Sequence, residues 1–325
     1  MRIESVRDLK AELAARAVVP AAGVHDESRP QALALGVAVL GHGRYGLAVR
    51  YRLGTAGVRS LVRRVVRDAG ESAEVDVRRT GRLTPLLAPT GRQVRVLGER
   101  GRVRPLRPGL SIGHPAVTAG TLGAFVLLED AVHALSNAHV LADSGRAAVG
   151  DPALQPGVAD GGTDADRVGV LVASVPLVGN GVNHADAAVV RLEDDLAGDV
   201  DPTYPAGRLS GTLVAAGEET VEKIGRTTGV TQGVVSAIEV DDVVVDYGSG
   251  VGALRFDGQI EISGAGDGPF SRGGDSGSLV YEPASRRALG LLFAGSESGG
   301  DNGAGLTYCN PVDDVLSLLG ARMMD

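Results

Sequence analysis

The stretch Gly273-Gly274-Asp275-Ser276-Gly277-Ser278-Leu279-Val280 places a serine in a glycine-rich turn directly before an apolar segment. A serine hydroxyl is a weak nucleophile at neutral pH, so it needs an imidazole to accept its proton and a carboxylate to fix the tautomer of that imidazole. The glycines around Ser276 allow backbone N–H groups to turn inward, which the stabilisation of an oxyanion requires. Gly-Asp-Ser-Gly also occurs in ordinary turns. The stretch therefore indicates a catalytic serine only if a suitable histidine and carboxylate occur elsewhere in the chain.

Two upstream segments contain the other residue types. His139 lies in Leu135-Ser136-Asn137-Ala138-His139-Val140-Leu141, and Asp186 lies in His184-Ala185-Asp186-Ala187-Ala188-Val189-Val190-Arg191-Leu192. Each residue alone also has a plain structural interpretation, as a core histidine or a turn aspartate. Their order along the chain, with Ser276 last, is that of chymotrypsin and differs from the order in subtilisins and α/β-hydrolases.

The composition favours a folded chain made largely of short strands. The 325 residues include 48 Gly and no Trp, with 43% hydrophobic and 22% charged residues. These values argue against collagen, coiled coils and wholesale disorder, and the length predicts two or three domains. From about residue 111 onward, short apolar runs alternate with turn residues, which is typical of a β-sandwich or barrel. One terminal helix is expected after Pro311, with Val312, Val315, Leu316 and Leu319 on one face.

Residues 1–107 differ from the rest of the chain in charge. They contain 21 Lys and Arg against 10 Asp and Glu, whereas residues 108–325 contain 11 against 30. Such a basic module can bind nucleic acid or an anionic surface, but it can equally dock on the acidic part of the same chain. For residues 1–107 we favour docking on the acidic part of the chain over binding of nucleic acid.

The same N-terminal region reads as a small α+β unit followed by a linker. A capped amphipathic helix, two strands, a second helix and a third strand are expected there, and the Arg-, Gly- and Pro-rich residues 80–109 are expected to form a linker or strap. The expected elements are a helix at 4–16, strands at 36–40 and 45–53, a helix at 58–66 and a strand at 73–77.

Cofactor and metal motifs are weak. Gly41-His42-Gly43-Arg44-Tyr45-Gly46 has the G-x-G-x-x-G spacing, but a strand follows it where a dinucleotide site requires a helix. The chain has only two lysines, neither in a Walker motif, and it lacks H-E-x-x-H and C-x-x-C. His184 with Asp186, and His139 with Asp143, have spacings compatible with a shared metal. We expect no cofactor and no metal.

The lone cysteine, Cys309, excludes an intrachain disulfide and favours a reducing compartment. Residues 1–20 carry charges where a secretory signal needs an apolar region, and no apolar run is long enough to span a membrane. We therefore expect a cytoplasmic protein without a membrane segment.

On these motifs, residues 108–325 resemble a trypsin-like serine peptidase of the chymotrypsin fold. Within that superfamily, four segments resemble the disulfide-free bacterial peptidases and the plant Narrow Leaf proteins: 111–114, 118–123, 290–296 and 310–312. The segment at 36–53 is similar to the small module that precedes that catalytic domain. The resemblance implies a mainly β fold with two six-stranded antiparallel β-barrels, at about 108–205 and 206–325. The implied fold also has a C-terminal helix after the second barrel and a small α+β module before the first.

The resemblance also implies the roles of the central residues. His139 would be the general base, Asp186 its orienting carboxylate and Ser276 the nucleophile, with the N–H groups of Gly274 and Ser276 as the oxyanion hole. The implied function is that of an intracellular serine endopeptidase, which hydrolyses protein or peptide substrates through an acyl-enzyme on Ser276. The alternative is a binding or scaffold protein that keeps the fold while the triad is idle.

Two further site features follow from the resemblance. Gly225-Arg226-Thr227-Thr228-Gly229 resembles a stretch of the bacterial alpha-lytic type enzymes, so an ion pair of Arg226 with Asp275 is inferred to support the oxyanion loop without zymogen processing. The specificity pocket is expected to be lined by Phe270, Ser271, Arg272, Phe293, Ala294 and Gly295. Neither Phe270–Arg272 nor Phe293–Ser296 contains an Asp that would select Lys or Arg. This favours a small or apolar residue before the scissile bond.

Overall fold

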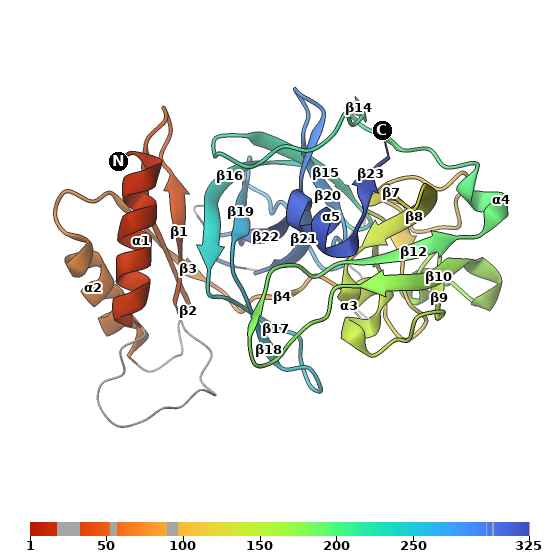
Figure 1. Cartoon of the computed structure of the whole chain (residues 1–325), viewed down its shortest axis with the longest axis horizontal. Helices are drawn as coiled ribbons and strands as arrows, with labels where there is room; N and C mark the ends of the chain where they lie inside the picture. Colours follow the sequence, from red (N-terminus) through yellow and green to blue (C-terminus); the bar gives the residue numbers. More distant parts are fainter. Residues whose placement is uncertain (18–32, 53–56, 90–96, 297, 301, 325) are drawn as a thin grey trace.

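The protein is described here by a computed structural model covering residues 1–17, 33–52, 57–89, 97–296, 298–300 and 302–324. Figure 1 shows the N-terminal elements at one end, a barrel in the middle and a second β unit at the other end. The expected mainly β architecture, with a helix near the C-terminus and an α+β unit in front, is confirmed. No helix among the described residues is both long and apolar enough to cross a membrane.

The middle unit is a closed barrel. Within the described residues, six antiparallel strands follow the order β15-β20-β21-β22-β19-β16, and pairing of β15 with β16 closes the ring. Side chains that alternate along these strands point inward and fill the barrel, as small barrels require. The strands are β15 (Thr220–Gly225), β16 (Gly229–Asp241), β19 (Gln259–Gly264), β20 (Leu279–Glu282), β21 (Arg287–Gly295) and β22 (Thr307–Pro311).

The second β unit is an antiparallel sheet. Its order among the described residues is β23-β7-β8-β12-β10-β9. Helix α5 (Val312–Leu319) and apolar residues of both units share one buried cluster, which includes Leu135, Leu291 and Val315 and fixes the two units against each other. The strands are β7 (Ala124–Leu128), β8 (Ala131–Ser136), β9 (Pro152–Leu154), β10 (Arg167–Ser174), β12 (Ala188–Leu192) and β23 (Arg322–Met323).

Short elements connect these units. Strands β11 (Val182–Asn183), β17 (Val243–Asp246) and β18 (Ala253–Phe256) form a small sheet, and two further pairs are β5 (Ser111–Ile112) with β6 (Gly120–Thr121) and β13 (Thr203–Tyr204) with β14 (Gly207–Arg208). The short helices are α3 (Ala138–Leu141) and α4 (Asp194–Ala197), with 3₁₀ turns η1 (Asp143–Gly145), η2 (Val158–Asp160) and η3 (Asp164–Asp166).

The N-terminal elements extend the barrel. Strand β1 pairs antiparallel with β16, so the barrel sheet continues through β1 into β2 and β3. The elements expected from the sequence are present, and α1 and α2 pack on this extension through Leu13, Val62 and Val65. They are α1 (Ile3–Ala17), β1 (Leu33–Val39), β2 (Tyr45–Arg52), α2 (Val58–Ala69) and β3 (Val75–Thr80). The next strand, β4 (Thr84–Pro85), pairs with β21.

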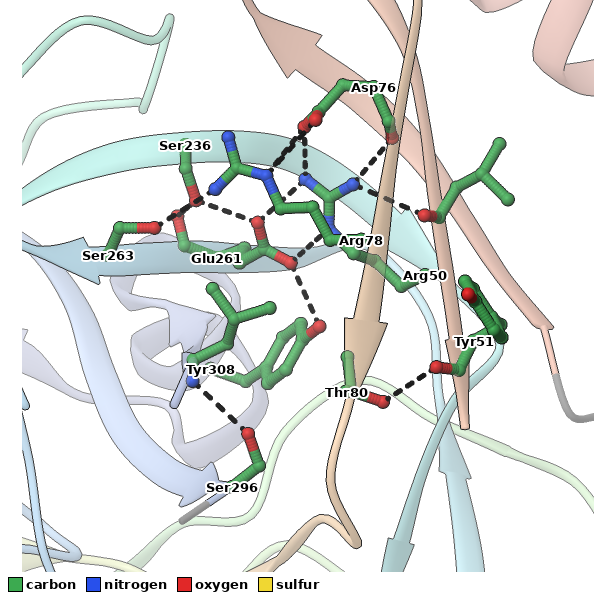
Figure 2. Close-up of polar contacts among 12 residues, drawn as sticks. Arg50, Tyr51, Asp76, Arg78, Thr80, Ser236, Glu261, Ser263, Ser296 and Tyr308 are labelled. Atoms are coloured by element: carbon green, nitrogen blue, oxygen red, sulfur yellow. Dashed lines mark hydrogen bonds and ion pairs between the residues drawn. The ribbon is translucent and has the colours of Figure 1, made fainter. Parts of the chain in front are cut away.

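A buried polar network joins this extension to the barrel (Figure 2). Arg50 on β2 donates to both carboxylate oxygens of Glu261 on β19, at 2.6 and 2.8 Å, and to Asp76 at 2.8 Å. Ser236 and Tyr308 donate to the same Glu261 carboxylate. Burial would raise the pKa of Glu261, but the charge of Arg50 and these hydrogen bonds outweigh it and lower the pKa. Glu261 is therefore held as a carboxylate inside the sheet.

Two partly exposed ion pairs cross the same junction. Arg7 pairs with Glu239 at 2.5 Å, and Lys10 pairs with Asp241 at 2.6 Å. Both cations lie on α1 and both carboxylates lie on β16. Two cations of α1 therefore contact two carboxylates of β16, although solvent-accessible pairs of this kind contribute little to stability.

Candidate active site

Neighbouring strands bring His139 and Asp186 together. His139 lies on α3, directly after β8, and Asp186 lies just before β12. Strands β8 and β12 are paired, with Ala188 opposite Ser136, so the residues beyond their ends meet at one edge of the sheet. Each residue is next to an apolar strand in the sequence, and the pairing of those two strands brings the residues together.

The His139–Asp186 contact has the geometry of an oriented base. Nδ1 of His139 lies 2.5 Å from Oδ2 of Asp186, and the backbone N–H of His139 donates to Oδ1 at 3.1 Å. Both side chains are almost fully buried, at 1% and 0% exposure. Because a carboxylate can only accept, Nδ1 carries the proton and Nε2 is left as the acceptor. Nε2 is buried and has no hydrogen-bond partner among the described residues.

Asp186 has two further partners that the sequence analysis missed. The hydroxyl of Tyr247 donates to Oδ2 at 2.5 Å, and Oδ1 of Asn310 accepts from the backbone N–H of Asp186 at 3.0 Å. Burial would raise the pKa of Asp186, but the electrostatic interaction with His139 and the hydrogen bonds from His139 and Tyr247 lower it overall. Tyr247 follows β17, more than sixty residues downstream, and no local sequence signal connects it to Asp186.

The loop that carries Ser276 lies against the residues that lead into the other β unit. Ser276 is fully buried between the strands, and its carbonyl accepts from the N–H of Thr121 at 2.7 Å. A Cβ on Gly277 would lie 2.0 Å from Oγ of Ser136, and the φ of +92° is also one that favours glycine. Gly277 is therefore required for the loop to approach the strand that leads to His139.

The two expected oxyanion donors converge on one oxygen. The N–H groups of Gly274 and Ser276 both donate to the carbonyl oxygen of Leu86, the latter at 3.2 Å. The Ser276 hydroxyl accepts from the N–H of Leu86 at 2.9 Å and donates to the carbonyl of Phe293 at 3.1 Å. The structure thus brings Ser276, Gly274 and a peptide carbonyl together, with the Ser276 hydroxyl bonded to Leu86 and Phe293 and not to His139.

The Arg226–Asp275 ion pair expected from the sequence is not the pairing found. Asp275 pairs with Lys223 at 3.4 Å, whereas Arg226 donates to Asp160 of η2 at 2.7 Å through Nε. Lys223 lies opposite Val280 in the β15–β20 pair, which directs its ammonium to the residue before Ser276. Burial lowers the pKa of Lys223, and the charge of Asp275 opposes this effect. Lys223, which lies on β15, therefore pairs with Asp275 in place of Arg226, which follows that strand.

Asp275 is nevertheless anchored as a support of the loop. It accepts from the N–H groups of Thr227 and Thr228 at 2.9 and 3.1 Å, and from that of Arg272 at 2.9 Å. Arg226 contributes from outside, because its guanidinium packs over Gly274 and donates to the Thr227 hydroxyl. Both residues named from the sequence therefore lie at the oxyanion loop, each with a different partner from the one expected.

Four of the six residues expected to line the specificity pocket lie near Leu86 or its neighbour Pro85. Phe270 and Leu86 are buried in one apolar cluster, and a Cβ on Gly295 would lie 3.1 Å from Cδ1 of Leu86. Phe293 and Ala294 lie along the same end of β21. The other two members of the expected set differ: Ser271 bonds to Thr307 at 2.6 Å, and Arg272 is exposed.

No cluster of three or more His, Cys, Asp or Glu side chains that could hold a metal ion is found among the described residues. His184 is exposed, and its contribution near the site is a backbone carbonyl that accepts from Gln259. The polar groups described at this site are the Ser276 hydroxyl, the His139–Asp186 pair and backbone N–H donors.

No protein-family model matches the sequence, and no curated protein matches it. Three similar solved structures are those of Thermobifida fusca protease A, a Nocardiopsis protease and a Cellulomonas bogoriensis chymotrypsin. They are 18%, 20% and 20% identical to this chain, with TM-scores of 0.47, 0.47 and 0.45. The matches cover 68%, 68% and 67% of this chain, and 99%, 99% and 98% of the three proteins.

Proposed function

We propose that this protein is a serine endopeptidase of the chymotrypsin type, in which Ser276, His139 and Asp186 form the catalytic triad. The observation that carries the proposal is the convergence of the Gly274 and Ser276 N–H groups on one peptide carbonyl oxygen beside the Ser276 hydroxyl. Backbone donors aimed at a carbonyl oxygen are what an acyl-transfer site needs to stabilise a tetrahedral intermediate.

Peptide hydrolysis follows from these groups in two steps. The Ser276 hydroxyl attacks the substrate carbonyl carbon and passes its proton to Nε2 of His139, while negative charge develops on the oxygen held by Gly274 and Ser276. His139 then protonates the leaving amine, and an ester forms on Ser276. Water, deprotonated by His139, hydrolyses the ester and regenerates the hydroxyl.

Burial leaves Nε2 of His139 free to accept a proton. Nε2 of His139 has no competing hydrogen-bond partner among the described residues, and the hydroxyl proton of Ser276 is donated to Phe293. The first proton transfer therefore requires that this hydroxyl turn from Phe293 to His139. Asp186 stabilises the imidazolium that results, because its lowered pKa keeps it ionised at neutral pH.

We also propose the finer features of this assignment. Residues 108–325 are the catalytic part and residues 1–107 an accessory module, in the manner of the disulfide-free bacterial and Narrow Leaf-type members. The single buried cysteine supports a fold that needs no disulfide and so an intracellular location. Protein or peptide chains are the substrates.

The test is cleavage of a mixed peptide library, followed by mass spectrometry. Ser276→Ala is expected to lower turnover by a factor on the order of 10⁶, as removal of a triad serine does elsewhere. Ser278→Ala is the matched control, because the buried Ser278 hydroxyl has no hydrogen-bond partner among the described residues. That control is expected to stay within about tenfold of wild type. Equal cleavage by wild type and Ser276→Ala would refute the proposal.

A further inference from the structure

A segment of the chain itself runs through the site. Strand β4 pairs antiparallel with the end of β21, with Pro85 opposite Ala294 and Thr84 opposite Gly295. The next residue, Leu86, continues this pairing by donating its N–H to the carbonyl of Phe293 at 3.4 Å. Residues 84–86 therefore lie as an added strand on the wall expected to select substrates.

Backbone hydrogen bonds hold the segment before and after the Leu86–Leu87 peptide bond. The Leu86 carbonyl oxygen accepts from the Gly274 and Ser276 N–H groups. After the bond, the N–H of Ala88 donates to the carbonyl of Ala119, the residue before β6, at 2.9 Å. Since Ser276 Oγ lies 2.9 Å from the nitrogen of Leu86, the nucleophile is beside the same residue.

The side chains of the segment are apolar and are placed in separate sites. Leu86 is 7% exposed and packs in the cluster that contains Phe270. Leu87 packs instead against the apolar cluster of the other β unit, and its carbonyl lies close to Gly273. Leu83 packs with Phe293 in a third cluster. Three leucines of this segment thus pack in three different apolar clusters.

We propose that this chain is its own substrate, and that Ser276 cleaves the peptide bond between Leu86 and Leu87. The proposal rests on the proposed function and adds its substrate class: an extended peptide with leucine before the scissile bond, proline preceding that leucine and an apolar residue after the bond. Backbone pairing to a sheet edge gives such a peptide its affinity, and the side-chain sites give it specificity.

The bonds balance as a hydrolysis. Ser276 Oγ bonds to the Leu86 carbonyl carbon, and its proton passes through His139 to the nitrogen of Leu87 as the C–N bond breaks. Water then cleaves the Leu86 ester. The products are residues 1–86 with a new carboxylate and residues 87–325 with a new amine. Until the bond is cut, the segment occupies the position that an external peptide needs.

The test follows the intact mass of the full-length protein after purification. Wild type is expected to yield two fragments whose junction is Leu86 and Leu87, at a first-order rate that does not change on tenfold dilution. Ser276→Ala is expected to remain a single chain. Leu86→Asp places a carboxylate in the apolar site beside Phe270 and is expected to slow the cut at least 100-fold, whereas Leu86→Met is expected to stay within about tenfold, because Leu and Met are similar in volume.

Labelling by a fluorophosphonate separates this proposal from the proposed function. Wild type and Leu86→Asp are both treated with the probe, because the Asp variant is expected to release the segment from the site. If Ser276 is labelled in either protein while wild type and Leu86→Met stay uncut at this bond, the self-substrate proposal is wrong and the peptidase assignment stands. If neither protein is labelled and no cut occurs, both are wrong. Cleavage only at another bond also overturns the self-substrate proposal.

Discussion

At the scale of single residues, the carboxylate of Asp186 is shared between His139 and Tyr247, which both lie 2.5 Å from Oδ2. The tyrosine hydroxyl can only donate to a carboxylate, so it favours the ionised form of Asp186 and helps to lower its pKa. Tyr247 does not touch the substrate position described here. It is a positioning residue for the base.

Tyr247→Phe is expected to reduce kcat about 10- to 100-fold, because a hydrogen bond to a charged group contributes about 1.5–3 kcal/mol. Loss of this bond raises the pKa of Asp186, so activity should be lost at a higher pH as the solution is made acidic. The pH profile of kcat/KM measures that shift. Tyr204→Phe is the control, since the buried Tyr204 hydroxyl bonds to the carbonyl of Gly123 and not to the triad. An unshifted acidic limb in Tyr247→Phe would contradict the assigned role.

At the scale of elements, the turn before β20 holds the two N–H groups that we propose as oxyanion donors. Gly277 has a φ of +92°, and an added Cβ would also lie 2.3 Å from the Thr121 carbonyl. The turn therefore has no room for a side chain at this point, and any shift moves the N–H of Ser276.

Gly277→Ala is expected to lower kcat by about 10²-fold or more, the effect of displacing one oxyanion donor. It should also destabilise the protein by about 1–3 kcal/mol through overpacking. Gly266→Ala is the matched control, because a Cβ there meets nothing within 4 Å. Peptidase assays and urea unfolding of both variants measure the two effects. Wild-type activity in Gly277→Ala would show that the turn does not set the donor geometry.

The sequence predicted the elements of the site better than their contacts. Val and Leu periodicity located β1, β2 and α2, and the His139 and Asp186 motifs bring these two side chains into contact. Ser276 as their partner stays a prediction. The partner of Asp275 was predicted wrongly, because Arg226 and Lys223 both lie near the end of β15 and only packing decides which one is close.

Long-range contacts account for what the sequence could not reveal. Residues 80–109 lack a regular period, so they read as a linker or strap, yet residues 84–86 form an added strand at the site. Part of that region, residues 90–96, lies outside the described residues. Tyr247 reaches Asp186 only through the small sheet of β17 and β18. No local sequence pattern predicts either contact, because each contact depends on how segments far apart in the sequence pack together.

At the scale of the whole molecule, the N-terminal elements and the barrel are joined by the Arg50–Glu261 pair, with side chains 1% and 0% exposed. Breaking one side of a buried pair leaves an uncompensated charge, which is far more costly than losing an exposed pair. The folded-state pKa of Glu261 is lowered from its ordinary value of 4.5. Its contribution to stability is therefore complete above about pH 4.5 and is lost as pH falls through the folded-state pKa.

Glu261→Gln is expected to lower the free energy of unfolding at pH 7 by about 3–5 kcal/mol. The variant should also lose part of the acid dependence seen in wild type. Glu239→Gln, which removes the exposed partner of Arg7, is the control and should cost less than about 1 kcal/mol. Urea unfolding between pH 3 and 7 measures both. Equal losses in the two variants would contradict the role of the buried network.

The measurement that tests the central claim most directly is fluorophosphonate labelling, with the modified residue located by peptide mass spectrometry. It compares wild type, Leu86→Asp, Ser276→Ala and Ser278→Ala. The account predicts a covalent adduct on Ser276 in every protein that retains this serine, strongest where the Leu86 segment has left the site, and no adduct in Ser276→Ala. An adduct that persists without Ser276, or none on Ser276 even in Leu86→Asp, would contradict the assignment of Ser276 as an activated nucleophile.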